Sequence, residues 1–217
     1  MRVVAALITA MLSFNTAAME KRVFASPAAL VAGIPHAVIG VEAKGDLNAD
    51  GRDDWAGFVQ NVNLISEARG TTRQLYILLQ TAAGSYVLAV QSAPEDLPER
   101  GTSENAFGED MTIENGMLSF KDRNLWRGCS VSDVYKFRFY KNDWRLVGVT
   151  STETNNNVDV SGRSQSIDLN LLTGAEEISL DERVTSRHKH KPRIFLLRDF
   201  NRYKDLFRRI GKTASVC

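Results

Sequence analysis

Residues 46 to 54 carry the side chains whose types and spacing could do chemistry. They read Asp-Leu-Asn-Ala-Asp-Gly-Arg-Asp-Asp, which places side-chain oxygens at positions 1, 3, 5 and 9, from Asp46, Asn48, Asp50 and Asp54. The main-chain carbonyl of Arg52 is available at position 7, and a glycine at position 6 permits a sharp turn. Calcium takes six to eight oxygens in flexible geometry, whereas magnesium requires a tighter octahedron. The spacing therefore predicts a calcium site formed by these five residues.

The stretch differs from an EF-hand at position 12. An EF-hand has a bidentate Glu there, whereas this chain has Gly57, and the flanking segments have the pattern of strands, not helices. Four acids within nine residues repel one another, and a bound cation would offset that repulsion while fixing the connection between two strands. We therefore expect a structural role for the ion. The alternative is an acidic turn that binds no ion.

Around this loop, ten stretches alternate apolar and polar residues, which is the period-2 pattern of half-buried strands. They are residues 36–43, 55–62, 74–81, 86–91, 111–114, 117–121, 134–140, 144–150, 166–172 and 176–180. Asn115-Gly116 is a strong hairpin signal, because both residue types tolerate positive φ. The chain is therefore expected to be mainly β, with one antiparallel, meander-type sheet domain that is sandwich or propeller-like.

The two ends of the chain differ from this body. Residues 1–18 have a basic start, an apolar run of about a dozen residues and a small-residue cleavage site, which predict a cleaved secretory signal. Residues 19–182 form the expected β-rich domain. Residues 183–217 are strongly basic, with eleven Lys and Arg between 183 and 212 against two acids, and apolar residues at helical spacing predict one amphipathic helix at about 200–210.

The predicted export determines the expected compartment and whether the cysteines can form a disulfide. No later segment is long enough to cross a bilayer, so the sequence predicts a periplasmic or secreted protein with no integral membrane segment. Cys129 and Cys217 are the only cysteines, and an intramolecular disulfide between them would attach the basic segment to the body. An unpaired carboxy-terminal thiol or an intermolecular bridge are the alternatives. Export and the near-zero net charge also argue against a nucleic-acid partner.

Motifs for catalysis are not found in the sequence. It has no Gly-x-Ser-x-Gly elbow, Walker loop, His-Glu-x-x-His or dinucleotide fingerprint. His188 and His190 lie among Lys and Arg, whose charges oppose a metal, and His36 is expected to be a packed or capping residue. We therefore expect a protein that is not an enzyme.

A wider pattern resembles a known group of proteins. The loop 46–54 resembles the calcium loops of bacterial FG-GAP and VCBS repeat proteins, although only one copy is present. The stretches that follow the loop, within residues 37 to 178, are similar to those of exported bacterial proteins that include secretion-system immunity proteins, and the layout is similar to that of periplasmic inhibitors of I-type lysozyme. Those inhibitors insert a loop into the enzyme's cleft. Gly84-Ser85-Tyr86 is expected instead to be an ordinary hairpin turn.

Three hypotheses about function follow. The first is a calcium-binding inhibitor or immunity protein whose partner is a secreted effector or a peptidoglycan hydrolase, as the resemblance implies. The second is a calcium-stabilised envelope module that binds polysaccharide or an anionic surface, with Trp126 and Trp144 as contact candidates. The third is a hydrolase that uses the acidic loop as its metal site. Export and the missing catalytic motifs favour the first.

Overall fold

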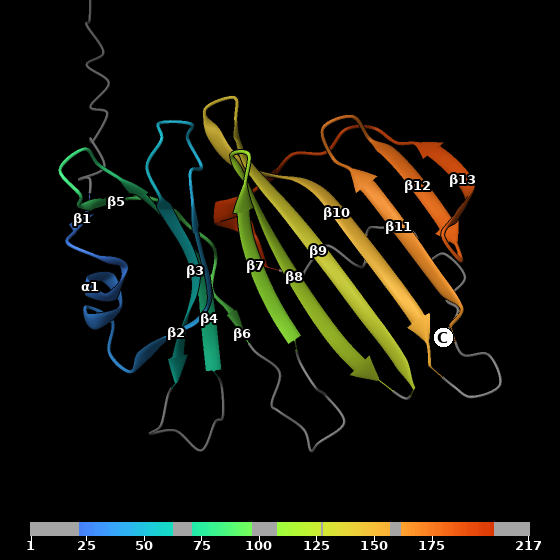
Figure 1. Ribbon diagram of the computed structural model, residues 1–217, viewed down its shortest axis with the longest axis horizontal. Helices are drawn as coiled ribbons and strands as arrows, with labels where there is room; N and C mark the ends of the chain where they lie inside the picture. The colour runs from blue at the N-terminus through green and yellow to red at the C-terminus, as the bar shows by residue number, and fades with distance from the viewer. Residues whose placement is uncertain (1–21, 63–70, 97–107, 127, 157–161, 202–217) are drawn as a thin grey trace, which may run out of the picture.

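The computed structural model describes residues 22–62, 71–96, 108–126, 128–156 and 162–201, and these form mainly antiparallel strands (Figure 1). The strands are β1 (Val23–Phe24), β2 (Ala37–Gly45), β3 (Asp54–Val62), β4 (Thr71–Gln80), β5 (Tyr86–Gln91), β6 (Glu95–Asp96), β7 (Gly108–Glu114), β8 (Met117–Trp126), β9 (Cys129–Tyr140), β10 (Asp143–Asn155), β11 (Ser164–Asn170), β12 (Ala175–Leu180), β13 (Arg183–Lys189) and β14 (Phe195–Leu196). A helix, α1 (Pro27–Ala32), and a 3-10 helix, η2 (Leu197–Asp199), complete the elements. The mainly β, antiparallel fold is confirmed.

Two sheets divide the strands between them. The first sheet has the order β1-β5-β4-β3-β2, with β6 paired to β4. The second sheet has the order β13-β12-β11-β10-β9-β8-β7, with β14 paired to β10, and is a meander in which each strand follows its neighbour along the chain. All ten stretches predicted as strands lie on these strands, most of them within one to three residues of the observed ends, although β8, β9 and β10 run about five residues further.

The main core lies where the two sheets meet. Phe58 on β3 and Ile77 on β4 point from the first sheet toward Phe120 on β8 and Phe137 on β9, and all four are fully buried. The rings of Phe58 and Phe120 meet edge to face with centroids 4.7 Å apart, a favoured aromatic geometry. Because successive side chains of a strand point to opposite faces, the other residues of β3 and β4 face away from this core.

A second, smaller core covers the opposite face of the first sheet. Trp55, Tyr76 and Leu78 pack there against Leu30 of α1. Ser26 caps α1 by accepting a hydrogen bond from the Ala29 amide at 3.2 Å, and a proline begins the first turn. This six-residue helix was not predicted from the sequence. With α1 in place, part of the second face of the first sheet is also covered, so apolar residues of β3 and β4 pack on both faces of the sheet.

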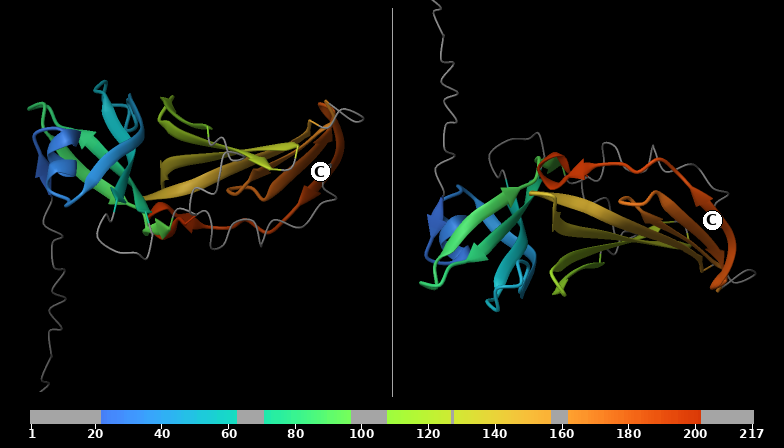
Figure 2. Two further views of the ribbon diagram at one scale, coloured as in Figure 1. Left: turned by 90° about the horizontal axis from the view of Figure 1, so that it is seen from below. Right: turned by 90° about the horizontal axis from the view of Figure 1, so that it is seen from above.

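The second sheet is long and curved, and it continues past the last predicted strand (Figure 2). β13 pairs with β12 along the edge, so the basic segment begins as part of this sheet. The chain then returns to β10 as β14, and Phe200 packs against Tyr135 and Phe137 with ring centroids 5.4 and 4.9 Å apart. Most of the amphipathic helix predicted at 200–210 lies outside the described residues, as do the signal segment and Cys217. Within the described residues, no helix is long and apolar enough to cross a membrane.

Candidate functional site

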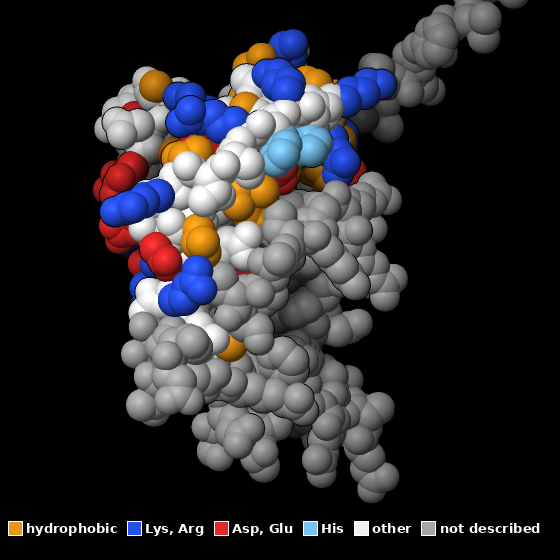
Figure 3. Space-filling view, turned by 90° about the vertical axis from the view of Figure 1, so that its right-hand side faces the viewer, with side chains coloured by type: hydrophobic (Ala, Val, Ile, Leu, Met, Phe, Trp, Pro, Cys, Tyr) orange, Lys and Arg blue, Asp and Glu red, His pale blue; other side chains and the backbone are white. Residues whose placement is uncertain are grey.

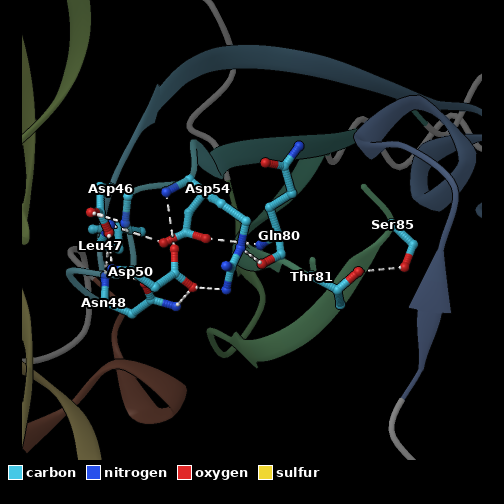
Figure 4. Close-up of polar contacts among 10 residues, drawn as sticks. Asp46, Leu47, Asn48, Asp50, Asp54, Gln80, Thr81 and Ser85 are labelled. Carbon is cyan, nitrogen blue, oxygen red and sulfur yellow. Dashed lines mark hydrogen bonds and ion pairs between the residues drawn. The ribbon is translucent and has the colours of Figure 1, made fainter. Parts of the chain in front are cut away.

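The acidic loop connects the paired ends of β2 and β3, where Gly45 faces Asp54 across the ladder (Figure 4). Two residues of the loop have positive φ, Ala49 at 61° and Gly51 at 78°. Glycine adopts this conformation without steric cost, and a Cβ at position 51 would meet no atom within 4 Å. The loop is therefore a tight, strand-to-strand connection, as the sequence predicts.

Asp46 organises the backbone of this loop. Its Oδ1 accepts hydrogen bonds from the amides of Asn48 and Asp50, at 3.2 and 3.1 Å, and its Oδ2 accepts one from the Gly51 amide at 2.8 Å. These bonds, led by the one from Gly51, hold the pKa of Asp46 below its ordinary value. The carboxylate is therefore charged and fixed in the centre of the turn.

Asn48, Asp50 and Arg52 lie around the same turn. The Asn48 side-chain amide donates to Asp50 Oδ2 at 2.9 Å, and Asp50 Oδ1 accepts from the Arg52 amide at 3.0 Å. The Arg52 guanidinium forms an ion pair with Asp50 and donates through Nε to the Gln80 carbonyl oxygen at 3.0 Å. A positive charge thus already occupies one side of this cluster of oxygens.

Asp54 differs from the other donors because it is fully buried. Its Oδ2 accepts from the Leu47 amide at 2.9 Å, and its Oδ1 accepts from the Gln80 amide at 2.8 Å. Burial raises its pKa, and the nearby charges of Asp50 and Asp46 add to the increase. Asp54 therefore ties the loop to the end of β4, and a cation beside it would relieve the electrostatic cost of its charge.

The structure brings all five predicted ligands into one loop, with Asp54 at its inner side. Among the described residues, no three His, Cys, Asp or Glu side chains are grouped closely enough to hold a metal ion. The predicted donor set includes three such carboxylates, those of Asp46, Asp50 and Asp54, so in this structure they are not drawn together around a single point. The Arg52 guanidinium pairs with Asp50 on one side of the loop, so an ion bound there would share that carboxylate with it.

Gly57 explains the departure from an EF-hand. A Cβ at this position would lie 2.7 Å from Cη2 of the Trp55 ring, which crosses directly over the glycine. Trp55 itself is fully buried and donates from Nε1 to Glu42. A glutamate at loop position 12 has no room here, so the site cannot be completed in the manner of an EF-hand.

The β7–β8 hairpin turn lies beside the acidic loop. A Cβ on Gly116, in the β7–β8 turn, would be 3.6 Å from the Leu47 carbonyl oxygen and 3.9 Å from a guanidinium nitrogen of Arg138. Arg138 also donates to the Asn115 carbonyl oxygen at 3.3 Å. The β2–β3 loop, the β7–β8 turn and the end of β9 thus form one continuous edge of the molecule, at the top of Figure 1.

The hairpin at Gly84-Ser85-Tyr86 is an ordinary turn. Ser85 Oγ and Thr81 Oγ1 are hydrogen-bonded at 2.8 Å, and Tyr86 is buried in the smaller core, with its hydroxyl 3.3 Å from Gln80 Nε2. These side chains are engaged within the protein. This segment therefore offers no protruding tyrosine of the kind that a cleft-inserting loop needs.

The histidines of the basic segment lie on the outer edge of the second sheet. Figure 3 shows them in pale blue beside Lys and Arg side chains. His190 Nε2 is 2.8 Å from Glu176 Oε2, and the rings of His188 and His190 are 6.4 Å apart. His190 therefore pairs with a single carboxylate, and the neighbouring positive charge still argues against a metal there.

A buried ion network lies between the two sheets, and it was not predicted from the sequence. Arg73 of β4 is 1% exposed, forms ion pairs with Glu95 of β6 and Glu109 of β7, and places its guanidinium carbon 4.1 Å from the centroid of the Phe58 ring. Burial alone would lower the pKa of Arg73, but the two carboxylates raise it above its ordinary value. The alternation of β4 could have revealed this residue, because Arg73 shares a face with Leu75 and Ile77.

Two further candidates are placed by the structure only in part. Cys129 is buried at the start of β9, and no cysteine in the described part of the chain is free. Its predicted partner Cys217 lies outside that part, so the pairing remains a prediction. Trp144 is 4% exposed and packs in the main core, which rules it out as a sugar platform, and the side chain of Trp126 is not described.

Comparisons with known proteins identify no family for this chain. No family model matches the chain, and no curated protein or solved structure matches it either. The resemblance to FG-GAP and VCBS loops and to immunity proteins therefore stays a prediction from the sequence, and function has to be argued from the site.

Proposed function

We propose that the chain is a non-enzymatic, calcium-binding protein of the periplasm or cell exterior that binds and inhibits another protein. The calcium-binding part of the proposal rests on one observation. Asp46, Asn48 and Asp50 lie around one tight turn, and the Arg52 guanidinium pairs with Asp50 (Figure 4). Side-chain oxygens from these three residues and Asp54, with the Arg52 carbonyl, would hold the ion.

A bound calcium ion would supply positive charge to a loop that otherwise concentrates negative charge. It would fix the β2–β3 connection, and through the bonds of Asp54 to Leu47 and Gln80 it would also fix the end of β4. The edge that includes the β7–β8 turn would gain rigidity in the same way. A rigid edge of loops on a sheet scaffold is a common basis for recognising another protein.

Calorimetry with calcium tests this part. We expect the mature chain from Met19, freed of metal, to bind one calcium ion more tightly than magnesium and to unfold at a higher temperature when calcium is present. Asp50→Ala should abolish both effects. Asp53→Ala is the matched control, because Asp53 is exposed and its substitution removes the same charge from the same loop. Equal behaviour of wild type and Asp50→Ala would contradict the site.

The inhibitory half of the proposal rests on the resemblance and on the expected export. Its partner is a secreted effector or a peptidoglycan hydrolase. Immobilised mature chain should capture such a protein from the secreted fraction of the producing cells, and the purified chain should then slow peptidoglycan cleavage by the captured enzyme. Capture without inhibition would refute the inhibitory role.

A second candidate function is the envelope module that binds an anionic surface. Trp144 no longer supports it, because that side chain is buried. A different feature favours it, the cluster of exposed cations and aromatic rings at the β9–β10 hairpin.

A further inference from the structure

The tip of the β9–β10 hairpin combines basic and aromatic side chains. We define the tip surface as Arg138, Phe139, Tyr140, Lys141 and Arg145. Phe139 is 52% exposed and Tyr140 is 37% exposed, although both belong to a strand whose inner residues are fully buried. The turn itself is tight, with Lys141 and Asn142 at φ values of 49° and 64°. The two partly exposed rings point to opposite faces of the hairpin, with Tyr140 on the face of Arg138 and Arg145, and with Phe139 5.6 Å from the Trp144 ring between centroids.

The positive charges of the tip surface are not neutralised. Arg138 and Arg145 are direct partners across the β9–β10 ladder, and like charges in that position destabilise a sheet. Among the described residues, no carboxylate forms an ion pair with Arg138, Lys141 or Arg145. The nearest acid of the hairpin, Asp143, is paired with Arg198 at 3.0 Å. An external anion would relieve this repulsion.

One hydrogen-bond donor of Arg145 lacks a partner. Its Nε is buried but has no hydrogen-bond partner, which is costly for a charged donor. Its guanidinium carbon lies 5.6 Å from the centroid of the Tyr140 ring, and Lys141 Nζ lies 5.4 Å from the same ring. Tyr140 thus lies beneath two of the cations of the tip surface.

We infer that the tip surface docks the protein on an anionic lipid bilayer. Arginine side chains match phosphate geometry, and basic residues near a bilayer gain roughly 1 kcal/mol each from anionic lipids. The Tyr140 ring, with its polar hydroxyl, favours the headgroup region, and the apolar Phe139 ring at the same tip can enter the acyl boundary, a contact that a soluble polyanion would not offer. The hairpin lies at the edge of the molecule in Figure 1, where it can meet a flat surface. This inference rests on the second candidate function, whose anionic surface it names as a lipid bilayer, and it does not depend on a protein partner.

Flotation with lipid vesicles tests the inference. The mature chain should float with vesicles of equal parts phosphatidylglycerol and phosphatidylcholine, should remain in solution with phosphatidylcholine alone, and should be released by high salt. The double variant Arg138→Gln/Arg145→Gln should bind at least about tenfold more weakly. Its thermal stability should be equal or higher, because the like-charge pair is gone. Calcium is present in all samples, because the acidic loop lies at the same edge.

The matched control is Arg163→Gln/Arg187→Gln, which removes the same charge from exposed ion pairs elsewhere on the second sheet. It should float like the wild type. Tyr140→Ser is a second variant that keeps the charge and should also weaken binding. Failure of the wild type to float, equal flotation of the two double variants, or binding to the acidic polysaccharide alginate without flotation would each overturn the inference.

Discussion

Two aspartates of the β2–β3 loop show how position determines the chemistry of one residue type. Asp46 accepts three backbone amides at the surface, and these bonds lower its pKa. Asp54 is buried, and burial raises its pKa although it accepts two amides. Asp46 therefore stabilises the loop as an anion, whereas the charge of Asp54 costs free energy until a cation offsets it.

The lowered pKa of Asp46 predicts a pH dependence of stability. The stabilising contribution of this carboxylate is complete well above its unfolded value of 3.8 and is lost as the pH falls through the lower folded value. In calcium-free buffer, the difference in unfolding free energy between wild type and Asp46→Ala should therefore be constant near neutral pH and shrink below 3.8. Chemical denaturation across this range measures it. A difference that stays constant into strong acid would contradict the prediction.

Packing against Trp55, and not backbone conformation, requires a glycine at position 57. We expect Gly57→Ala to lower the unfolding free energy by about 1–3 kcal/mol, because the new Cβ would displace the buried Trp55 ring. Gly148→Ala is the control, since its Cβ would meet neighbours only at 3.6 Å, an ordinary contact distance. Chemical denaturation of the two variants compares them, and an equal effect on stability would refute this account.

At the scale of elements, three hairpins use turns of the same conformation with different sequences. Asn115-Gly116, Lys141-Asn142 and Asp181-Glu182 all have positive φ at both residues. Only the first pair has the residue types that favour it. The other two turns adopt this conformation because the strands that they connect require it.

The β12–β13 turn should therefore be open to improvement. We expect Glu182→Gly to raise the unfolding free energy by about 0.5–1 kcal/mol, because φ is 65° at this position and glycine adopts that value without strain. Asp181 is kept, since its Oδ1 accepts from the Ser164 amide at 2.9 Å. Glu182→Ala retains the strain and should bring no gain. Thermal unfolding distinguishes these outcomes, and a loss of stability in Glu182→Gly would contradict the explanation.

For the whole molecule, the Arg73 network links the two sheets at their main core. Arg73→Met should lower the unfolding free energy by about 3–5 kcal/mol, because it leaves the buried carboxylate of Glu95 and that of Glu109 without their shared cation. Arg187→Met removes an arginine whose pair with Glu177 is exposed, so its effect should stay within about 0.5 kcal/mol. Urea unfolding measures both, and similar small effects would show that the network contributes little.

The sequence by itself determined the features that depend on near neighbours. The alternation of β2 through β12 is a local pattern, and so is the spacing of Asp46, Asn48 and Asp50, because each depends on residues a few positions apart. The strands and the donor set of the loop were therefore predictable. The calcium ion and the partner remain proposals.

Only the tertiary structure decided which groups meet across the chain. The division into two sheets, the burial of Trp144 and Tyr86, and the network of Arg73 with glutamates 22 and 36 residues away depend on long-range packing. The opposition of Arg138 and Arg145 depends on strand register. A period-2 pattern shows that a residue faces one side of its strand, but it carries no information about which element covers that side, because contacts between distant segments are selected by the packing of the whole molecule.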